Sequence, residues 1–185
     1  MDAANAKTVQ YSKTTITELM IPSYANFGGK IHGGILLSLM DKVAYVCAAR
    51  HAGTYCVTAS IDHVEFLAPV EVGELVSLKA SVNYVGHSSL VVGIRITSEN
   101  VKTQEIKHTN TSYFTMVAVD EHHKAVSVPG LILESKDEIR RFAEVLRKKD
   151  LTQQTKAHLK HIKTPLEIET YKRLLEKEKC IINFA

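Results

Sequence analysis

The feature that most limits the fold is the run of residues 35–50, ILLSLMDKVAYVCAAR. It contains neither proline nor glycine and is apolar almost all the way round a helical projection. A helix with this pattern is buried on most of its sides. Gly53 marks the expected end of the helix. The rest of the chain must supply the elements that cover this helix, so the neighbouring segments decide the architecture.

After this helix the hydrophobic period changes to two. In residues 75–85 apolar and polar side chains alternate, which is typical of a half-buried strand, and residues 90–96 repeat the pattern. The short segment 86–89 between them has the length of a hairpin connection. Three further segments have strand character: 14–19, 56–67 and 106–119. We therefore expect an α+β fold, in which an antiparallel sheet wraps around one long central helix.

Beyond residue 130 the pattern becomes helical again. Ile139, Phe142 and Leu146 recur at spacings of three and four, with Lys and Arg between them. Residues 150–163 are polar and weakly patterned, whereas residues 166–179 show a second apolar stripe at helical spacing. The sequence thus predicts a helical C-terminal extension.

The chain is expected to contain a main domain over residues 9–130 and the extension over residues 131–185. The extension holds 13 Lys and Arg against 9 Asp and Glu, and it carries the whole basic excess of the chain. Mixed charges of this kind are typical of a solvated helical surface, so we predict no binding of nucleic acid.

Composition narrows the class of protein further. The 185 residues are 45% hydrophobic and 23% charged, as in ordinary globular proteins. No apolar run reaches the roughly 18 to 20 residues that span a bilayer, and the polar first twenty residues lack the apolar core of a signal peptide. We expect a cytoplasmic protein without a membrane span. The three cysteines show no CxxC spacing and the histidine pairs lack acidic or Cys partners, so no metal site is predicted.

Asp41 is the residue that does not fit its surroundings, because it stands inside the most apolar helix. A buried ionised carboxylate is costly unless it is paired, and no residue three or four positions away is a cation. Two interpretations stay open. In the first, structural interpretation, Asp41 bonds Ser38, Tyr45 or another segment's backbone, or lies on an exposed stripe with Lys42. In the second, Asp41 is a catalytic carboxylate in a low-dielectric cleft that raises its basicity.

The loop before the helix offers further polar groups. Gly33 and Gly34 stand at the amino end of the helix, where free N–H groups and the helix dipole stabilise negative charge on a carbonyl oxygen. Asp41 lies two turns further on and could share that atom only if another element, such as a second subunit, packed closely. Asn26 is either a turn residue or a donor to water or a carbonyl, and His32 is either a helix cap or a catalytic group.

These residues resemble the hotdog-fold acyl-CoA thioesterases, in particular the cytosolic brain-type acyl-CoA hydrolases and their single-domain bacterial relatives. The most specific part is His-Gly-Gly at 32–34, a gap of six residues, Asp41, and then Ala-Ala-Arg-His at 48–51. The segment Val57-Thr58-Ala59-Ser60 also matches. The resemblance covers roughly residues 9–130 and implies the hotdog fold.

The resemblance also implies an activity, the hydrolysis of fatty acyl-CoA to a free fatty acid and CoA. Asp41 would act as general base or as nucleophile, and the family pattern leaves both open. Asn26 would come from the partner subunit and position water or substrate. The N–H groups of Gly33 and, above all, Gly34 would polarise the thioester carbonyl, with His32 among the residues that bind the substrate.

Further expectations concern CoA and assembly. Gly86, Ser88 and Ser89 lie in the turn where related enzymes place the pantetheine or phosphate groups of CoA. CoA is part of the substrate, so no separate cofactor is implied. The resemblance implies at least a homodimer and a hexamer built as a trimer of dimers. The C-terminal extension could cover the acyl tunnel, bridge subunits or bind a partner.

Three alternatives share the fold. A phenylacetate-type or hydroxybenzoyl-type thioesterase also carries His-Gly-Gly, but the Ala-Ala-Arg-His continuation favours the acyl-CoA hydrolases. A hotdog dehydratase needs a His–acid pair and a Gly-x-Pro loop, which the sequence does not show. A non-catalytic acyl-CoA sensor is disfavoured because Asp41 is retained. The sequence leaves the acyl chain length open.

Overall fold

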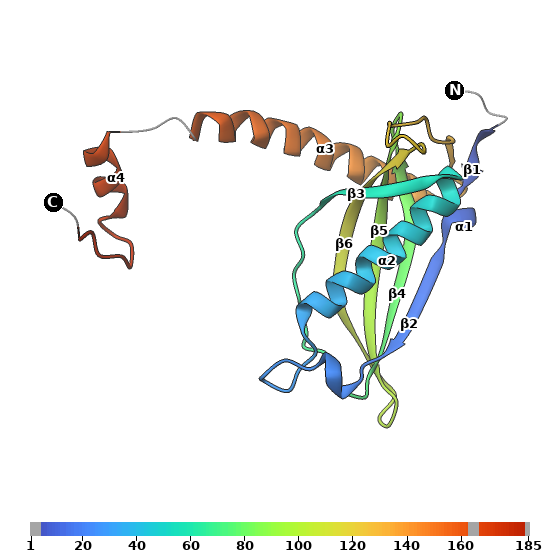
Figure 1. Ribbon diagram of the computed structural model, residues 1–185, viewed down its shortest axis with the longest axis horizontal. Coiled ribbons are helices and arrows are strands. Elements are labelled where there is room, and N and C mark those ends of the chain that lie inside the picture. The colour runs from blue at the N-terminus through green and yellow to red at the C-terminus, as the bar shows by residue number, and fades with distance from the viewer. Residues whose placement is uncertain (1–4, 163–166, 184–185) are drawn as a thin grey trace. The chain divides into compact units, whose positions relative to one another are not determined.

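The computed structural model describes residues 5–162 and 167–183. One long helix, α2, packs against a five-stranded antiparallel sheet in the order β2-β4-β5-β6-β3, and Figure 1 shows the strands curving along it. The expected α+β fold is confirmed. The elements are β2 (Thr14–Leu19), α2 (Gly33–Ala52), β3 (Tyr55–Ile61), β4 (Leu75–Val85), β5 (Ser89–Asn100) and β6 (Glu105–Val119).

Short elements frame this sheet. The two-residue strands β1 (Lys7–Thr8) and β7 (Leu131–Ile132) pair in parallel, which the sequence did not predict because two residues show no periodicity. One turn of helix, α1 (Val9–Ser12), and a 3₁₀ turn, η2 (Pro22–Tyr24), stand on either side of β2.

The ends of α2 follow capping rules. His32 is its N-cap, and Gly53 adopts a left-handed conformation with φ of 75° that ends the helix. The backbone N–H of Gly53 donates to the carbonyl of Ala49 at 2.8 Å. The helix is therefore longer at both ends than the apolar run at 35–50 predicted.

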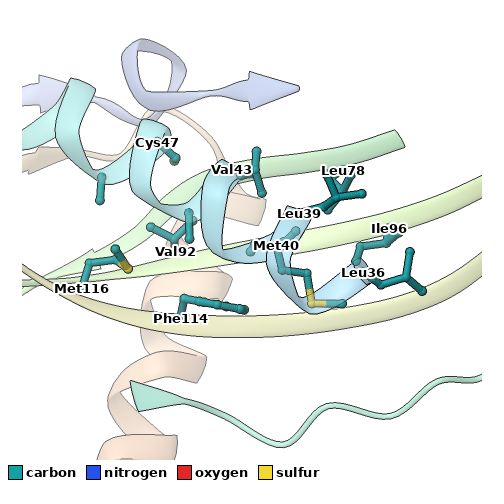
Figure 2. Packing of buried hydrophobic residues seen from close by; sticks show 14 of the residues in the cluster. Leu36, Leu39, Met40, Val43, Cys47, Leu78, Val92, Ile96, Phe114 and Met116 are labelled. Carbon is teal, nitrogen blue, oxygen red and sulfur yellow. The ribbon is translucent and has the colours of Figure 1, made fainter. Parts of the chain in front are cut away.

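The core lies between α2 and the inner face of the sheet (Figure 2). Buried side chains of the helix meet buried side chains of β4, β5 and β6, among them Leu36, Met40, Val43, Cys47, Leu78, Val92, Ile96 and Phe114. The opposite face of the helix is exposed, and it includes Asp41, Lys42, Tyr45 and Val46. The prediction that α2 is buried on most sides is thus wrong for the single chain, because the sheet covers only one face.

Strand β3 is shorter than predicted. The segment 56–67 was expected to be one strand, but its ladder with β6 ends at Ile61. The chain then leaves the sheet and touches β6 again where the Leu67 N–H donates to the Thr109 carbonyl at 2.9 Å. This detour places the Phe66 ring against the amino end of α2, where it lies 3.3 Å from the position a Cβ atom would take on Gly33.

The C-terminal part is helical, as predicted. Helix α3 spans Lys136–Ile162, including the polar stretch without clear periodicity, and α4 spans Ile168–Leu175. Residue 166, where the second helix was expected to begin, lies outside the described residues. The chain divides into two compact units, residues 1–146 and 147–185, and the predicted boundary at residue 130 stays a prediction. Within the described residues, no helix is both long and apolar enough to cross a membrane.

Candidate active site

Asp41 lies on the exposed face of α2 and is held from one side by β3. Its Oδ1 accepts a hydrogen bond from the Thr58 hydroxyl at 2.6 Å. A hydroxyl bonded to a carboxylate at this distance is a strong, charge-assisted contact. The prediction of a buried Asp41 is wrong for the single chain, and the alternative of an exposed stripe shared with Lys42 is confirmed.

The carboxylate opens into a pocket of about 450 Å³ between α2 and β3. Tyr45 and Tyr55 form one wall, with their ring centroids 5.7 Å apart. The ladder of β3 with β6 shifts register between Thr58 and Ser60. Such irregularities re-aim side chains at the edge of a sheet, and here Thr58 contacts the helix. The pocket thus presents one oriented carboxylate beside apolar and aromatic walls.

The thiol in this pocket is not a competing nucleophile. Burial raises the pKa of Cys56, which lines the pocket, to about 11, and burial raises that of Cys47 to about 12 despite a hydrogen bond with Ser12. Because the thiolate is the reactive form, both thiols are inert near neutral pH. Since the thiol in this pocket is unreactive, Asp41 is the lining residue whose carboxylate can act on a substrate there.

Asn26 organises the loop before the helix. Its Oδ1 accepts the backbone N–H groups of Gly28 at 2.9 Å and Lys30 at 3.2 Å, so the interpretation as a turn residue is confirmed. With the side-chain amide assigned in this way, Nδ2 makes no hydrogen bond within the described part of the chain. The same side chain can therefore hold its loop and still donate to another molecule.

His32 is the cap of α2. Its Nδ1 accepts the Gly34 N–H at 2.9 Å, which requires a ring without a proton on Nδ1. The cap interpretation is confirmed, and the expectation that the Gly34 N–H is free is wrong for this conformation. The Gly33 N–H makes no hydrogen bond among the described residues, so it is the donor that the loop leaves open.

These loop residues share a second pocket. Asn26, His32 and Gly33 line an open space of about 560 Å³ together with Phe27, whose side chain is fully exposed. Asp41 does not line this pocket. At a rise of 1.5 Å per residue, Asp41 lies about 10 Å along the helix from Gly34. One chain thus groups the loop residues with each other but not with Asp41.

The turn between β4 and β5 lies at the other end of the helix. The Gly86 N–H donates to the Ser89 carbonyl at 2.7 Å, and the His87 carbonyl accepts the Val128 N–H at 2.9 Å. The neighbouring Pro129 carbonyl contacts Nε2 of His51, in the last turn of α2, at 3.1 Å. His51, at this end, lies about 27 Å along the helix from Gly33. Within one chain the structure therefore does not bring the predicted binding residues of the turn, Gly86, Ser88 and Ser89, together with Gly33.

Thr58 is the site residue that the sequence did not predict. Thr58 lies in the segment at 57–60 that matches the family, and nothing in the sequence indicates a role for it. A threonine in a strand is ordinary, and its seventeen-residue separation from Asp41 gives no local signal. Only the packing of β3 along α2 shows that the hydroxyl points at the carboxylate.

Comparison with known proteins places this geometry in a family. The model of the thioesterase superfamily matches residues 28–105. Protein VdlD of Helicobacter pylori is 45% identical over 153 residues, which cover 83% of this chain and 86% of VdlD. A Bacillus subtilis protein named "Uncharacterized acyl-CoA thioester hydrolase YkhA" is 35% identical over 139 residues, which cover 75% of this chain and 81% of YkhA.

Solved structures of similar proteins agree with this family assignment. A hexameric acyl-CoA thioesterase in its apo form superposes with a TM-score of 0.80 at 35% identity, over 83% of this chain and 98% of that one. An acyl-CoA hydrolase from Staphylococcus aureus, solved with butyryl coenzyme A and coenzyme A, has a TM-score of 0.74 at 30% identity, over 85% of this chain and 98% of that one. Alanine variants of the Staphylococcus enzyme at one asparagine, one aspartate and one threonine also have structures.

The chain belongs to the thioesterase superfamily. Within that family, YkhA is named an acyl-CoA thioester hydrolase, and the two solved structures are named an acyl-CoA thioesterase and an acyl-CoA hydrolase, so the enzyme class expected from the sequence is confirmed.

Proposed function

We propose that the protein hydrolyses fatty acyl-CoA to free fatty acid and CoA, with Asp41 as the reacting carboxylate. The observation that carries this proposal is the contact between Asp41 and Thr58 at the mouth of an open pocket. In the Staphylococcus enzyme the altered asparagine, aspartate and threonine are separated by fifteen and seventeen positions. Asn26, Asp41 and Thr58 have the same two spacings here, which supports a shared role for all three.

The hydrogen bond from Thr58 fixes one carboxylate oxygen and leaves the other for chemistry. Acting as a general base, Asp41 takes a proton from water as the water oxygen bonds to the thioester carbon. Asp41 then passes this proton to the sulfur as the C–S bond breaks, so that CoA leaves as the thiol and the acid is the second product. Acting as a nucleophile, Asp41 would first bond to the thioester carbon and displace CoA by breaking the C–S bond, and water would then hydrolyse the resulting mixed anhydride to the acid and free Asp41. Both routes need the same oriented carboxylate.

The developing negative charge on the carbonyl oxygen needs donors that Asp41 does not have beside it. The open Gly33 N–H at the helix terminus and the Asn26 amide can supply them, and the Gly34 N–H can join them once the His32 side chain turns away. Because these groups lie about two helical turns from Asp41 in one chain, we propose that the loop of the partner subunit brings them to it.

This arrangement requires at least a homodimer. The structural neighbour named as hexameric supports a larger assembly, which we propose to be a trimer of dimers. The hydroxyls of Ser88 and Ser89, with the backbone at Gly86, are proposed to contact CoA. The chemistry uses side chains, backbone donors and water, so the proposal includes no cofactor beyond the CoA of the substrate. The cytoplasmic location stays a prediction.

The test is the release of free CoA thiol from a panel of straight-chain acyl-CoAs, short to long, and aryl-CoAs. Wild type should hydrolyse straight-chain substrates, and Asp41→Asn should turn over at least about a hundredfold more slowly while remaining folded by circular dichroism. Asp150→Asn, which neutralises an exposed carboxylate on α3, is the matched control and should keep wild-type rates. Near-normal turnover by Asp41→Asn would refute the assignment, and binding without hydrolysis would show a sensor.

A further inference from the structure

A small basic pocket lies on the sheet's outer face, beside the start of α3. The inner face of the same strands is occupied by Leu78, Ile96 and their neighbours, which pack against α2. The pocket holds about 190 Å³. Its lining includes four cationic side chains and no acidic one: Lys79, Arg95, Arg140 and Arg141. It shares no lining residue with the pockets that contain Asp41 and Asn26.

Two of the cations lie directly opposite each other. Lys79 on β4 pairs with Arg95 on β5, and Arg95 in turn faces Thr111 on β6. Like charges at directly opposite positions of an antiparallel ladder are destabilising. Among the described residues, neither Lys79 nor Arg95 has an acidic partner in an ion pair. The sheet therefore carries an unfavourable pair of charges that an anion would relieve.

Helix α3 adds two guanidinium groups that form ion pairs along the helix. Arg140 forms ion pairs with Asp137 and Glu144, and Arg141 forms one with Asp137 at 2.7 Å. These acids lie on the same helix and hold the arginines in place without lining the pocket. Each guanidinium has five donors, so the remaining N–H groups can bind an oxyanion, which planar guanidinium groups recognise in a bidentate manner.

A buried amide completes the set of donors. Asn83 is 4% exposed and lines the pocket, and its Oδ1 accepts a hydrogen bond from the Ser81 hydroxyl at 3.0 Å. Its Nδ2 lies 2.3 Å from the position that a Cβ atom would take on Gly93. Only a glycine in β5 allows the amide to lie there. Asn83 and Gly93 both line the pocket, so this close approach holds the amide group beside it.

We propose that this pocket binds the phosphate group of a small anion, either inorganic phosphate or the end of a phosphorylated metabolite. Its volume of about 190 Å³ leaves room for a phosphate group, and because the pocket is open to solvent the rest of a larger anion can lie outside it. Lys79 and Arg95 have no acidic partner among the described residues, whereas Asp137 and Glu144 offset the charges of Arg140 and Arg141. The two positive charges that remain match the charge of a phosphate group. The bound anion would link β4 and β5 to the first turns of α3.

The experiment is calorimetric titration of the full chain with phosphate and with pyrophosphate in chloride buffer at constant ionic strength, repeated with saturating desulfo-CoA to occupy the acyl-CoA site. We expect saturable binding that persists with desulfo-CoA. Arg95→Gln should weaken it at least about tenfold, since it removes a bidentate donor, and should raise Tm in the absence of phosphate because it removes the like-charge pair. Lys102→Gln, at an exposed cation in the β5–β6 turn, should bind like wild type.

Several results would overturn the proposal. They are an absence of saturable binding in wild type, a loss of binding when desulfo-CoA is present, and equal affinity in wild type and Arg95→Gln. If Arg95→Gln does not fold, Lys79→Gln replaces it with the same expected outcome. ADP is titrated in the same way, with desulfo-CoA present, and tighter binding of ADP than of phosphate would identify a phosphorylated metabolite as the source of the anion. Binding of ADP without any binding of phosphate or pyrophosphate would contradict a site that recognises the phosphate group itself. None of these readouts depends on hydrolysis, so they are independent of the proposed function.

Discussion

Asp41 and Glu74 each accept a hydrogen bond from a hydroxyl, but they differ in burial and in the number of their other donors. Glu74 is 4% exposed and accepts hydrogen bonds from the Ser98 hydroxyl at 2.5 Å and the Glu71 N–H at 3.0 Å, with Lys107 at 2.8 Å. Asp41 is exposed, and Thr58 is its one hydrogen-bond donor among the described residues.

The difference separates a structural carboxylate from a chemical one. Three donors from three segments occupy most of the acceptor sites of Glu74, and the residue is 4% exposed, so the group ties the sheet together and is out of reach of a substrate. Asp41 has one oxygen fixed and one oxygen facing a pocket, which is what a base or nucleophile requires. The predictions below separate effects on stability from effects on turnover.

The largest effect is expected at the buried carboxylate. Glu74→Gln removes the charge that pairs with Lys107, and hydrogen bonds to charged groups contribute about 1.5–3 kcal/mol. The free energy of unfolding at pH 7 should fall by about that amount in urea denaturation, with kcat within about twofold of wild type because Glu74 is outside the site. A loss of turnover in the folded variant would contradict the separation.

The next effect is on turnover. Thr58→Val keeps the shape of the side chain and removes the hydrogen bond to Asp41. Because this hydrogen bond orients the carboxylate, kcat should fall roughly tenfold, which corresponds to an increase of about 1.4 kcal/mol in the activation free energy. Thr58→Ser restores the hydroxyl and should recover most of the rate. Equal rates for the valine and serine variants would show that the hydroxyl does not orient Asp41.

The pH dependence of stability should also follow Glu74. Burial alone raises the pKa of this carboxyl, but the hydrogen bonds from Glu71, Lys107 and Ser98 and the charge of Lys107 hold it below its ordinary value of 4.5. The unfolded chain therefore binds the proton first, and the stabilisation is full above about pH 4.5 and is lost as the pH falls below it. Unfolding free energies measured from pH 7 to pH 3 should decline less steeply in Glu74→Gln; parallel curves would contradict this.

The smallest effect is expected for stability at the exposed carboxylate. Asp41→Asn should change the free energy of unfolding by less than about 0.5 kcal/mol, because an exposed amide can still accept the hydrogen bond from Thr58. Chemical denaturation of the same preparation used for turnover measures this. A large destabilisation would mean that any loss of activity reflects folding rather than chemistry.

The fold was predictable where periodicity and burial coincide within one chain. Residues 75–85 alternate strictly, and strand β4 has those same bounds. The prediction was wrong where tertiary hydrogen bonds decide: the strand character of 56–67 continues past Ile61, yet the chain leaves the sheet there to reach the helix terminus. Composition cannot show such a departure, because residues on both sides of it are compatible with a strand.

The sequence could predict which residue types form the site better than it could predict their burial and contacts. The sequence points to Asp41 because a buried carboxylate in an apolar helix is costly, but Asp41 is buried only if its own chain covers that face of the helix. Tyr45 and Val46 on the same face are 39% and 36% exposed, so the apolar pattern there includes surface that one chain does not bury. Thr58 and the occupied Gly34 N–H depend on contacts across the fold, which no local pattern reports.

The central claim is a site in which Asp41 of one subunit works with Asn26 of the partner subunit. The most direct measurement mixes two inactive variants, Asn26→Ala and Asp41→Asn, under conditions in which mass spectrometry shows that subunits exchange. At equal amounts half of the dimers are mixed, and each mixed dimer has one intact site, so about one quarter of wild-type activity should return. No recovery despite proven exchange would contradict a shared site.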